Sequence, residues 1–149
     1  ELVYEKVSKS PLHSFLSEVL EDALRGALPA GFHVRGEEPL TLGESEPEPD
    51  LAVVRGCRED FRTAHPTTAE LVIEVCITSH AFDRSKLRAY AGAGVKECWL
   101  VLGPERQIEA YSQPAGDNYA RMSFRIVDFF TTVVSRVLSP PGTGKVSFV

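Results

Sequence analysis

The sequence predicts a single α/β domain over residues 1–149, in which a central mixed β-sheet packs against helices. Apolar residues recur at helical spacing from Leu12 to Ala27, which predicts an amphipathic helix. The runs 70–77 and 95–102 are strongly apolar, as is typical of strands buried on both faces. A helical pattern over 81–93 lies between these runs, and this strand–helix–strand order predicts a right-handed crossover that joins two parallel strands.

The first helix is expected to begin at Pro11, because Ser10 is a favourable N-cap and proline is tolerated in the first turn. Pro29 and Gly31 end it. The strands expected along the chain are residues 2–7, 32–35, 39–42, 51–55, 70–77, 95–102 and 107–111.

Connections and the C-terminal region complete the expected order. An acidic loop over 43–49 and a polar, irregular connection over 56–69 flank the strand 51–55. The segment 126–137 fits either a strand or a helix, and a proline-containing turn after it precedes a final strand.

Composition limits the class of protein. The 149 residues are 43% hydrophobic and 25% charged, which is ordinary for a globular domain. No apolar run approaches the roughly 20 residues that a membrane helix needs, and the N-terminus lacks a signal-peptide pattern. The net charge of −5 counts against a general nucleic-acid binder, although basic residues near the candidate site could form a local patch or a solvated surface.

The cysteines indicate a reducing compartment. Cys57, Cys76 and Cys98 are odd in number and lack CxxC spacing, so neither a zinc site nor a disulfide framework is indicated. Cys76 and Cys98 fall in expected strands, where a buried thiol behaves as a small hydrophobe. We therefore expect a cytoplasmic protein.

Three residues form the candidate catalytic and metal site. Asp50 opens the apolar strand 51–55, Glu74 lies inside a buried strand, and Lys86 follows on the next helix. Two carboxylates on neighbouring strands are hard oxygen ligands suited to Mg²⁺ or Mn²⁺. The ammonium of Lys86 could orient a nucleophilic water or offset charge on a phosphate. The pattern therefore favours metal-dependent hydrolysis of phosphodiester bonds.

Each of these residues also has a purely structural interpretation. Asp50 could cap a strand or a turn, and Lys86 could be an exposed lysine. Glu74 could form a buried salt bridge with a nearby arginine. His13 and Glu18, both on the first helix, are possible accessory residues, although His13 could equally be a surface histidine.

The chain resembles the Uma-type putative restriction endonuclease family of the PD-(D/E)XK nuclease superfamily. The resemblance covers about residues 1–119. The blocks that carry it are residues 10–13, 48–50, 71–79, 82–86, 90–91, 94–95, 97–101 and 108–111.

The resemblance implies a restriction-endonuclease-like core, in which helices flank a mixed sheet, and homodimers are common among such enzymes. It implies that Asp50 and Glu74 are the two metal-binding carboxylates. The lysine of the superfamily normally stands two residues after the second carboxylate, where this chain has Cys76. In the Uma-type family the lysine lies on the following helix, and Lys86 matches it.

The leading hypothesis is a Mg²⁺-dependent endonuclease that acts on DNA. A second hypothesis is a catalytically decayed nuclease fold that binds nucleic acid or a protein partner without turnover. The acidic net charge favours it, as does the Asp83–Lys86 spacing of three residues where the family more often shows four. A third is a structural domain in which Arg88 neutralises Glu74, far from Asp50.

Overall fold

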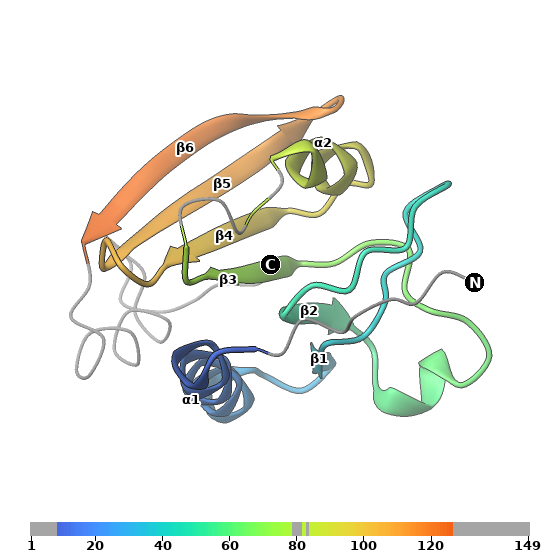
Figure 1. Ribbon diagram of the computed structural model, residues 1–149. Coiled ribbons are helices and arrows are strands. Elements are labelled where there is room, and N and C mark those ends of the chain that lie inside the picture. Colours follow the sequence, from blue (N-terminus) through green and yellow to red (C-terminus); the bar gives the residue numbers. More distant parts are fainter. Residues whose placement is uncertain (1–8, 79–81, 83, 127–149) are drawn as a thin grey trace, which may run out of the picture.

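The computed structural model describes residues 9–78, 82 and 84–126. In this part of the chain six strands form one sheet in the order β1-β2-β3-β4-β5-β6. Only β3 and β4 pair in parallel, and the other neighbours are antiparallel. The expected mixed sheet flanked by helices is thus confirmed, and Figure 1 shows α1 and α2 on opposite sides of it.

Two α-helices, one 3-10 helix and six strands follow one another in the described part of the chain. Their bounds are α1 Pro11–Ala27, β1 Phe32–Gly36, β2 Leu51–Arg55, the 3-10 helix η1 Arg58–Phe61, β3 Leu71–Cys76, α2 Ser85–Gly92, β4 Glu97–Leu102, β5 Gln107–Ala115 and β6 Asn118–Ile126. No helix in this described part of the chain is both long and apolar enough to cross a membrane.

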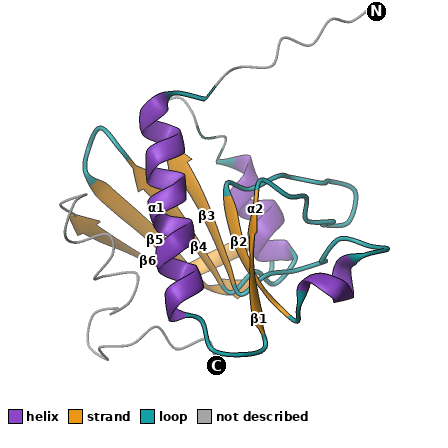
Figure 2. Ribbon diagram, turned by 90° about the horizontal axis from the view of Figure 1, so that it is seen from below, coloured by secondary structure: helices purple, strands orange, loops and turns teal. Residues whose placement is uncertain are grey.

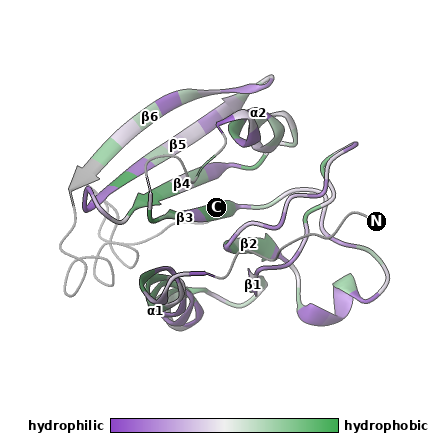
Figure 3. Ribbon diagram, in the orientation of Figure 1, coloured by the Kyte–Doolittle hydropathy of each residue, from purple (hydrophilic) through white to green (hydrophobic). Residues whose placement is uncertain are grey.

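Two layers of apolar side chains sandwich the sheet. In Figure 2, α1 lies in front of the strands and α2 lies behind them. Alternate residues of a strand point to opposite faces, so each central strand contributes to both layers. Figure 3 shows the hydrophobic residues concentrated in β2, β3 and β4. Buried members of the α1 layer include Leu16, Leu20, Leu24, Val53, Ile73 and Val101, and those of the α2 layer include Val54, Val72, Tyr90, Cys98 and Leu100.

Helix α1 begins where the sequence predicts. The Ser10 hydroxyl accepts a hydrogen bond from the His13 amide at 3.1 Å, and Pro11 occupies the first turn. This cap fixes the first turn of α1, and with it the position of His13, at one edge of the sheet.

Four details of the structure differ from the sequence-based expectations. Residues 39–42 form no strand: Leu42 makes only an isolated bridge with Ser45, and the apolar pattern reflects the burial of Leu40 and Leu42. The connection 56–69 contains the helical turn η1, and α2 begins at Ser85 rather than near residue 81. Strand β6 was not predicted, because its alternation carries exposed and charged residues at a sheet edge.

Several expectations fall on residues that the structure does not describe. These are the strand 2–7, most of the segment 126–137, the C-terminal turn and strand, and Asp83 of the Asp83–Lys86 spacing.

Packing of α1 should contribute strongly to stability. Leu20 is fully buried against the sheet, so Leu20→Ala should lower the free energy of unfolding by about 2–5 kcal/mol through lost burial and a residual cavity. Leu12 on the same helix is 46% exposed, and Leu12→Ala should change it by about 0.5 kcal/mol or less. Urea unfolding measures both, and equal effects of the two substitutions would contradict this assignment of the core.

Candidate active site

Asp50 and Glu74 meet where β2 begins beside the middle of β3. Leu51 pairs with Ile73 in this antiparallel ladder, so Asp50 and Glu74 occupy the next opposed positions. Oδ2 of Asp50 also accepts a hydrogen bond from the Val75 amide at 2.7 Å, so its side chain extends the ladder beyond the last paired residue.

Asp50 is fixed from the α1 side as well. Its Oδ1 lies 3.1 Å from Nε2 of His13 and 3.8 Å from Nζ of Lys9. Lys9 also forms an ion pair with Glu37, whose amide donates to the Asp50 carbonyl at 3.1 Å. The Asp50 side chain is 12% exposed. These contacts leave a carboxylate of fixed position at the rim of the sheet.

Glu74 is a buried carboxyl with a strongly raised pKa. It is 7% exposed, and the Tyr90 hydroxyl donates a hydrogen bond to its Oε1 at 2.7 Å. Burial raises the pKa of Glu74 to about 7; the hydrogen bond from Tyr90 opposes this rise, whereas the negative charge of Asp50 adds to it. The pKa of Tyr90 is itself raised by burial and by Glu74, so Tyr90 remains a neutral donor.

Helix α2 brings Lys86 to the same place. Lys86 and Tyr90 are four residues apart on α2 and therefore lie on one face of it. The positive charge of Lys86 helps to lower the pKa of Glu74, so the ammonium lies within electrostatic reach of that carboxyl. The structure thus brings together the three side chains singled out in the sequence, while their chemical roles stay predictions.

The donor set fits a divalent cation of the Mg²⁺ type. Mg²⁺ is commonly held by one or two carboxylates, with water at its other positions. Asp50 and Glu74 supply this pair, and their mutual repulsion, which raises the pKa of Glu74, is what a cation between them would relieve. Among the described residues there is no group of three His, Cys, Asp or Glu side chains that could hold a metal. A metal here would therefore depend on two carboxylates and solvent.

The accessory candidates line a cavity beside Asp50. This cavity of about 320 Å³ lies between α1 and the ends of β1 and β2, and His13, Glu18, Glu21 and Glu37 contribute to its wall. His13 touches Asp50, whereas Glu18 has no hydrogen bond or ion pair with any described residue. The structure therefore gives His13 a direct contact with the candidate site and Glu18 only a place near it.

Two residues of the site were missed in the sequence. Tyr90 is a buried core residue, and its hydroxyl also donates a hydrogen bond to Glu74. Its spacing of four from Lys86 was the available signal. Lys9 gave no signal, because it lies far from Asp50 in the sequence and the two meet only in the folded chain.

The arginine alternatives are not supported. Arg88 is exposed, and the described residues include no Glu74–Arg88 ion pair. Two arginines close to the candidate site in the sequence are paired with other carboxylates, Arg55 with Glu70 and Arg84 with Glu109.

The raised pKa of Glu74 predicts a pH-dependent stability. Below about pH 4.5 this carboxyl is protonated in both the folded and the unfolded chain, so its ionisation does not lower the free energy of unfolding. As the pH rises toward 7, the unfolded chain ionises first, so the free energy of unfolding falls. The loss should approach about 3 kcal/mol, and Glu74→Gln should abolish it. Urea unfolding against pH measures this.

The exposed Glu44 provides the control, and Glu44→Gln should follow the wild-type pH profile. A stability difference between Glu74→Gln and wild type that stays constant from pH 4.5 to above pH 7 would contradict the assignment.

Comparison with known proteins identifies the family. Residues 3–140 match the Uma2 family, described as "Putative restriction endonuclease". A crystal structure described as a putative nuclease belonging to DUF820, from Anabaena variabilis, has a similar fold, with a TM-score of 0.62 and 16% identity over 83% of this chain and 72% of that one. No curated protein matches the chain. At 16% identity the structural likeness establishes the fold alone. Because the family match spans most of the chain and continues past residue 119, where the resemblance noted in the sequence ends, this protein belongs to the Uma2 family.

Proposed function

We propose that this protein is a metal-dependent endonuclease that hydrolyses phosphodiester bonds of DNA. The observation that carries the proposal is the neighbouring pair Asp50 and Glu74, two largely buried carboxylates at adjacent places on β2 and β3 whose charges interact, with Lys86 within electrostatic reach of Glu74. If the pair had only a structural role, it would lower the stability of the fold, because neighbouring buried charges of like sign repel one another. Family membership supports the same class of reaction.

Asp50 and Glu74 would hold Mg²⁺, or Mn²⁺ in its place. When bound, the ion would polarise the phosphate and lower the pKa of a coordinated water. Asp50 is oriented for this by the Val75 amide and His13, and Glu74 is oriented by Tyr90. Lys86 would place positive charge beside the phosphate, where it could orient the attacking water and offset the negative charge that develops.

Removal of either carboxylate should abolish cleavage. Asp50→Ala and Glu74→Ala should each lower the rate of Mg²⁺-dependent DNA cleavage by roughly a hundredfold or more, because one ligand cannot hold the ion in place. Plasmid nicking with and without Mg²⁺ measures this, and Glu44→Gln serves as the matched acidic control. Unchanged cleavage in either alanine variant would refute the proposal.

Tyr90 should act through Glu74. In Tyr90→Phe the hydrogen bond that lowers the pKa of Glu74 is lost, so this pKa should rise further. The acidic limb of the pH–rate profile should therefore move to higher pH. Tyr119, whose hydroxyl donates to the Val95 carbonyl, offers a control: Tyr119→Phe should leave the limb in place. A limb that does not move in Tyr90→Phe would exclude this role.

A second candidate function is DNA or partner binding without turnover. It is favoured by the cationic Lys9 close to Asp50 and by the lack of a third metal-ligating side chain among the described residues. Calorimetric titration with Mg²⁺ separates the two functions, since only the endonuclease requires binding that Asp50→Ala removes. A homodimer, which the family resemblance makes possible, and the expected cytoplasmic location both stay predictions.

A further inference from the structure

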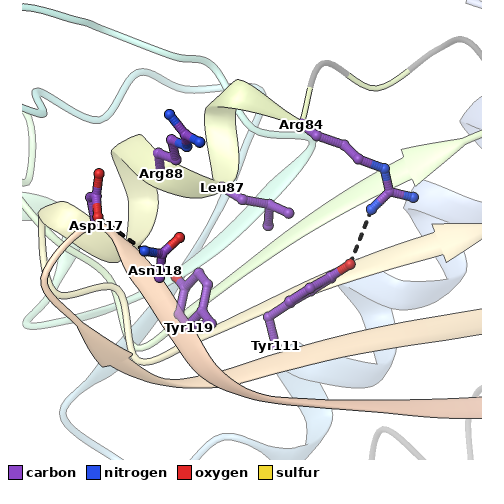
Figure 4. A pocket seen from close by; sticks show the side chains of 7 residues that line it. All are labelled: Arg84, Leu87, Arg88, Tyr111, Asp117, Asn118 and Tyr119. Carbon is purple, nitrogen blue, oxygen red and sulfur yellow. Dashed lines mark hydrogen bonds between the residues drawn. The ribbon is translucent and has the colours of Figure 1, made fainter.

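A groove lies beside the candidate site, between α2 and the β5–β6 hairpin. It has a volume of about 190 Å³. Figure 4 shows that Arg84, the N-cap residue of α2, and Arg88 on α2 border it, that Tyr111 and Tyr119 line the sheet side, and that Asp117 and Asn118 come from the end of the hairpin where β6 begins. The groove therefore has polar and aromatic walls with two guanidinium groups along one border.

The two arginines differ in how they are held. Arg84 donates to Oε2 of Glu109 at 3.2 Å and to the Tyr111 hydroxyl at 3.0 Å, so its guanidinium has a fixed position. Arg88 is exposed and makes no hydrogen bond or ion pair with the described part of the chain. One turn of α2, a rise of about 6 Å, separates them. Arg88 is thus the cation of this groove that is available to a ligand.

The pairing of the strands connects the groove with the candidate site. Glu74 pairs with Leu100 on β4, and Leu100 pairs with Glu109 on β5, so the three lie in one row across the sheet. Neighbouring strands are about 4.8 Å apart, which puts Glu109 roughly 10 Å from Glu74. Arg84, bound to Glu109, therefore lies within a few nucleotides' reach of the two carboxylates.

We propose that this groove binds a backbone phosphate of the DNA strand close to the cleaved bond, with Arg88 as the main contact. The inference rests on the proposed function for the identity of the strand. Guanidinium groups suit phosphate oxygens because they donate several hydrogen bonds in one plane. Asn118 could add an amide donor. The carboxylate of Asp117 opposes an anion in this groove, and it bonds to the Asn118 amide at 3.1 Å.

Arg88 and Asp117 therefore provide opposite tests at one place. Arg88→Gln should weaken the binding of a fluorescein-labelled DNA duplex, whereas Asp117→Asn should strengthen it. Because a phosphate contact releases a counterion, Arg88→Gln should also reduce the slope of log K against log [NaCl] by about 1. Arg88→Lys should retain most of this slope. Fluorescence anisotropy over a series of NaCl concentrations, without Mg²⁺, measures all of these.

Arg58, an exposed arginine on η1, provides the matched control, and Arg58→Gln should keep the wild-type slope. The proposal is overturned if Arg88→Gln has the same slope as Arg58→Gln, or if Asp117→Asn binds more weakly than wild type. Cleavage with Mg²⁺ is measured separately. If no cleavage occurs while binding still depends on Arg88, the endonuclease function alone is refuted and the phosphate contact stands.

Discussion

The site depends on two carboxylates that the sheet holds close together and largely away from water. Leu51 and Ile73 set the register of β2 and β3, and this register makes Asp50 and Glu74 neighbours. Burial removes Glu74 from water, and the negative charge of the nearby Asp50 repels its ionised form, so the pKa of Glu74 rises to about 7. The surrounding polar contacts can be understood as partial compensation: a tyrosine hydroxyl on Glu74, and an amide, an imidazole and an ammonium around Asp50.

Much of this arrangement was visible in the sequence, because carboxylates that begin or interrupt apolar strands are conspicuous. The capping residues of α1 and the strand–helix–strand order gave the two helices and the parallel pair correctly. The hydroxyl of Tyr90 could not be distinguished from that of an ordinary core tyrosine, since its partner lies on another element. Strand β6 was not predicted, because an edge strand with exposed residues lacks the apolar face on which strand prediction depends.

Polar groups on the α2 side form two systems separated by the apolar Leu100. One contains Glu74, Tyr90 and Lys86, and the other contains Glu109, Arg84 and Tyr111. In each group a largely buried glutamate of the sheet interacts with side chains of α2 or of its N-cap residue Arg84. The first glutamate lacks a direct ion pair among the described residues, whereas the second is bound by a guanidinium. This difference is consistent with the proposal that the first glutamate binds a cation, whereas the second is already paired within the protein.

Helix α2 is only eight residues long, yet its opposite sides face the carboxylate site and the arginine groove. A small rigid-body tilt of this helix would displace Lys86 and Arg88 together. If the proposed function holds, binding of the DNA strand and alignment of its reacting phosphate would then be mechanically linked.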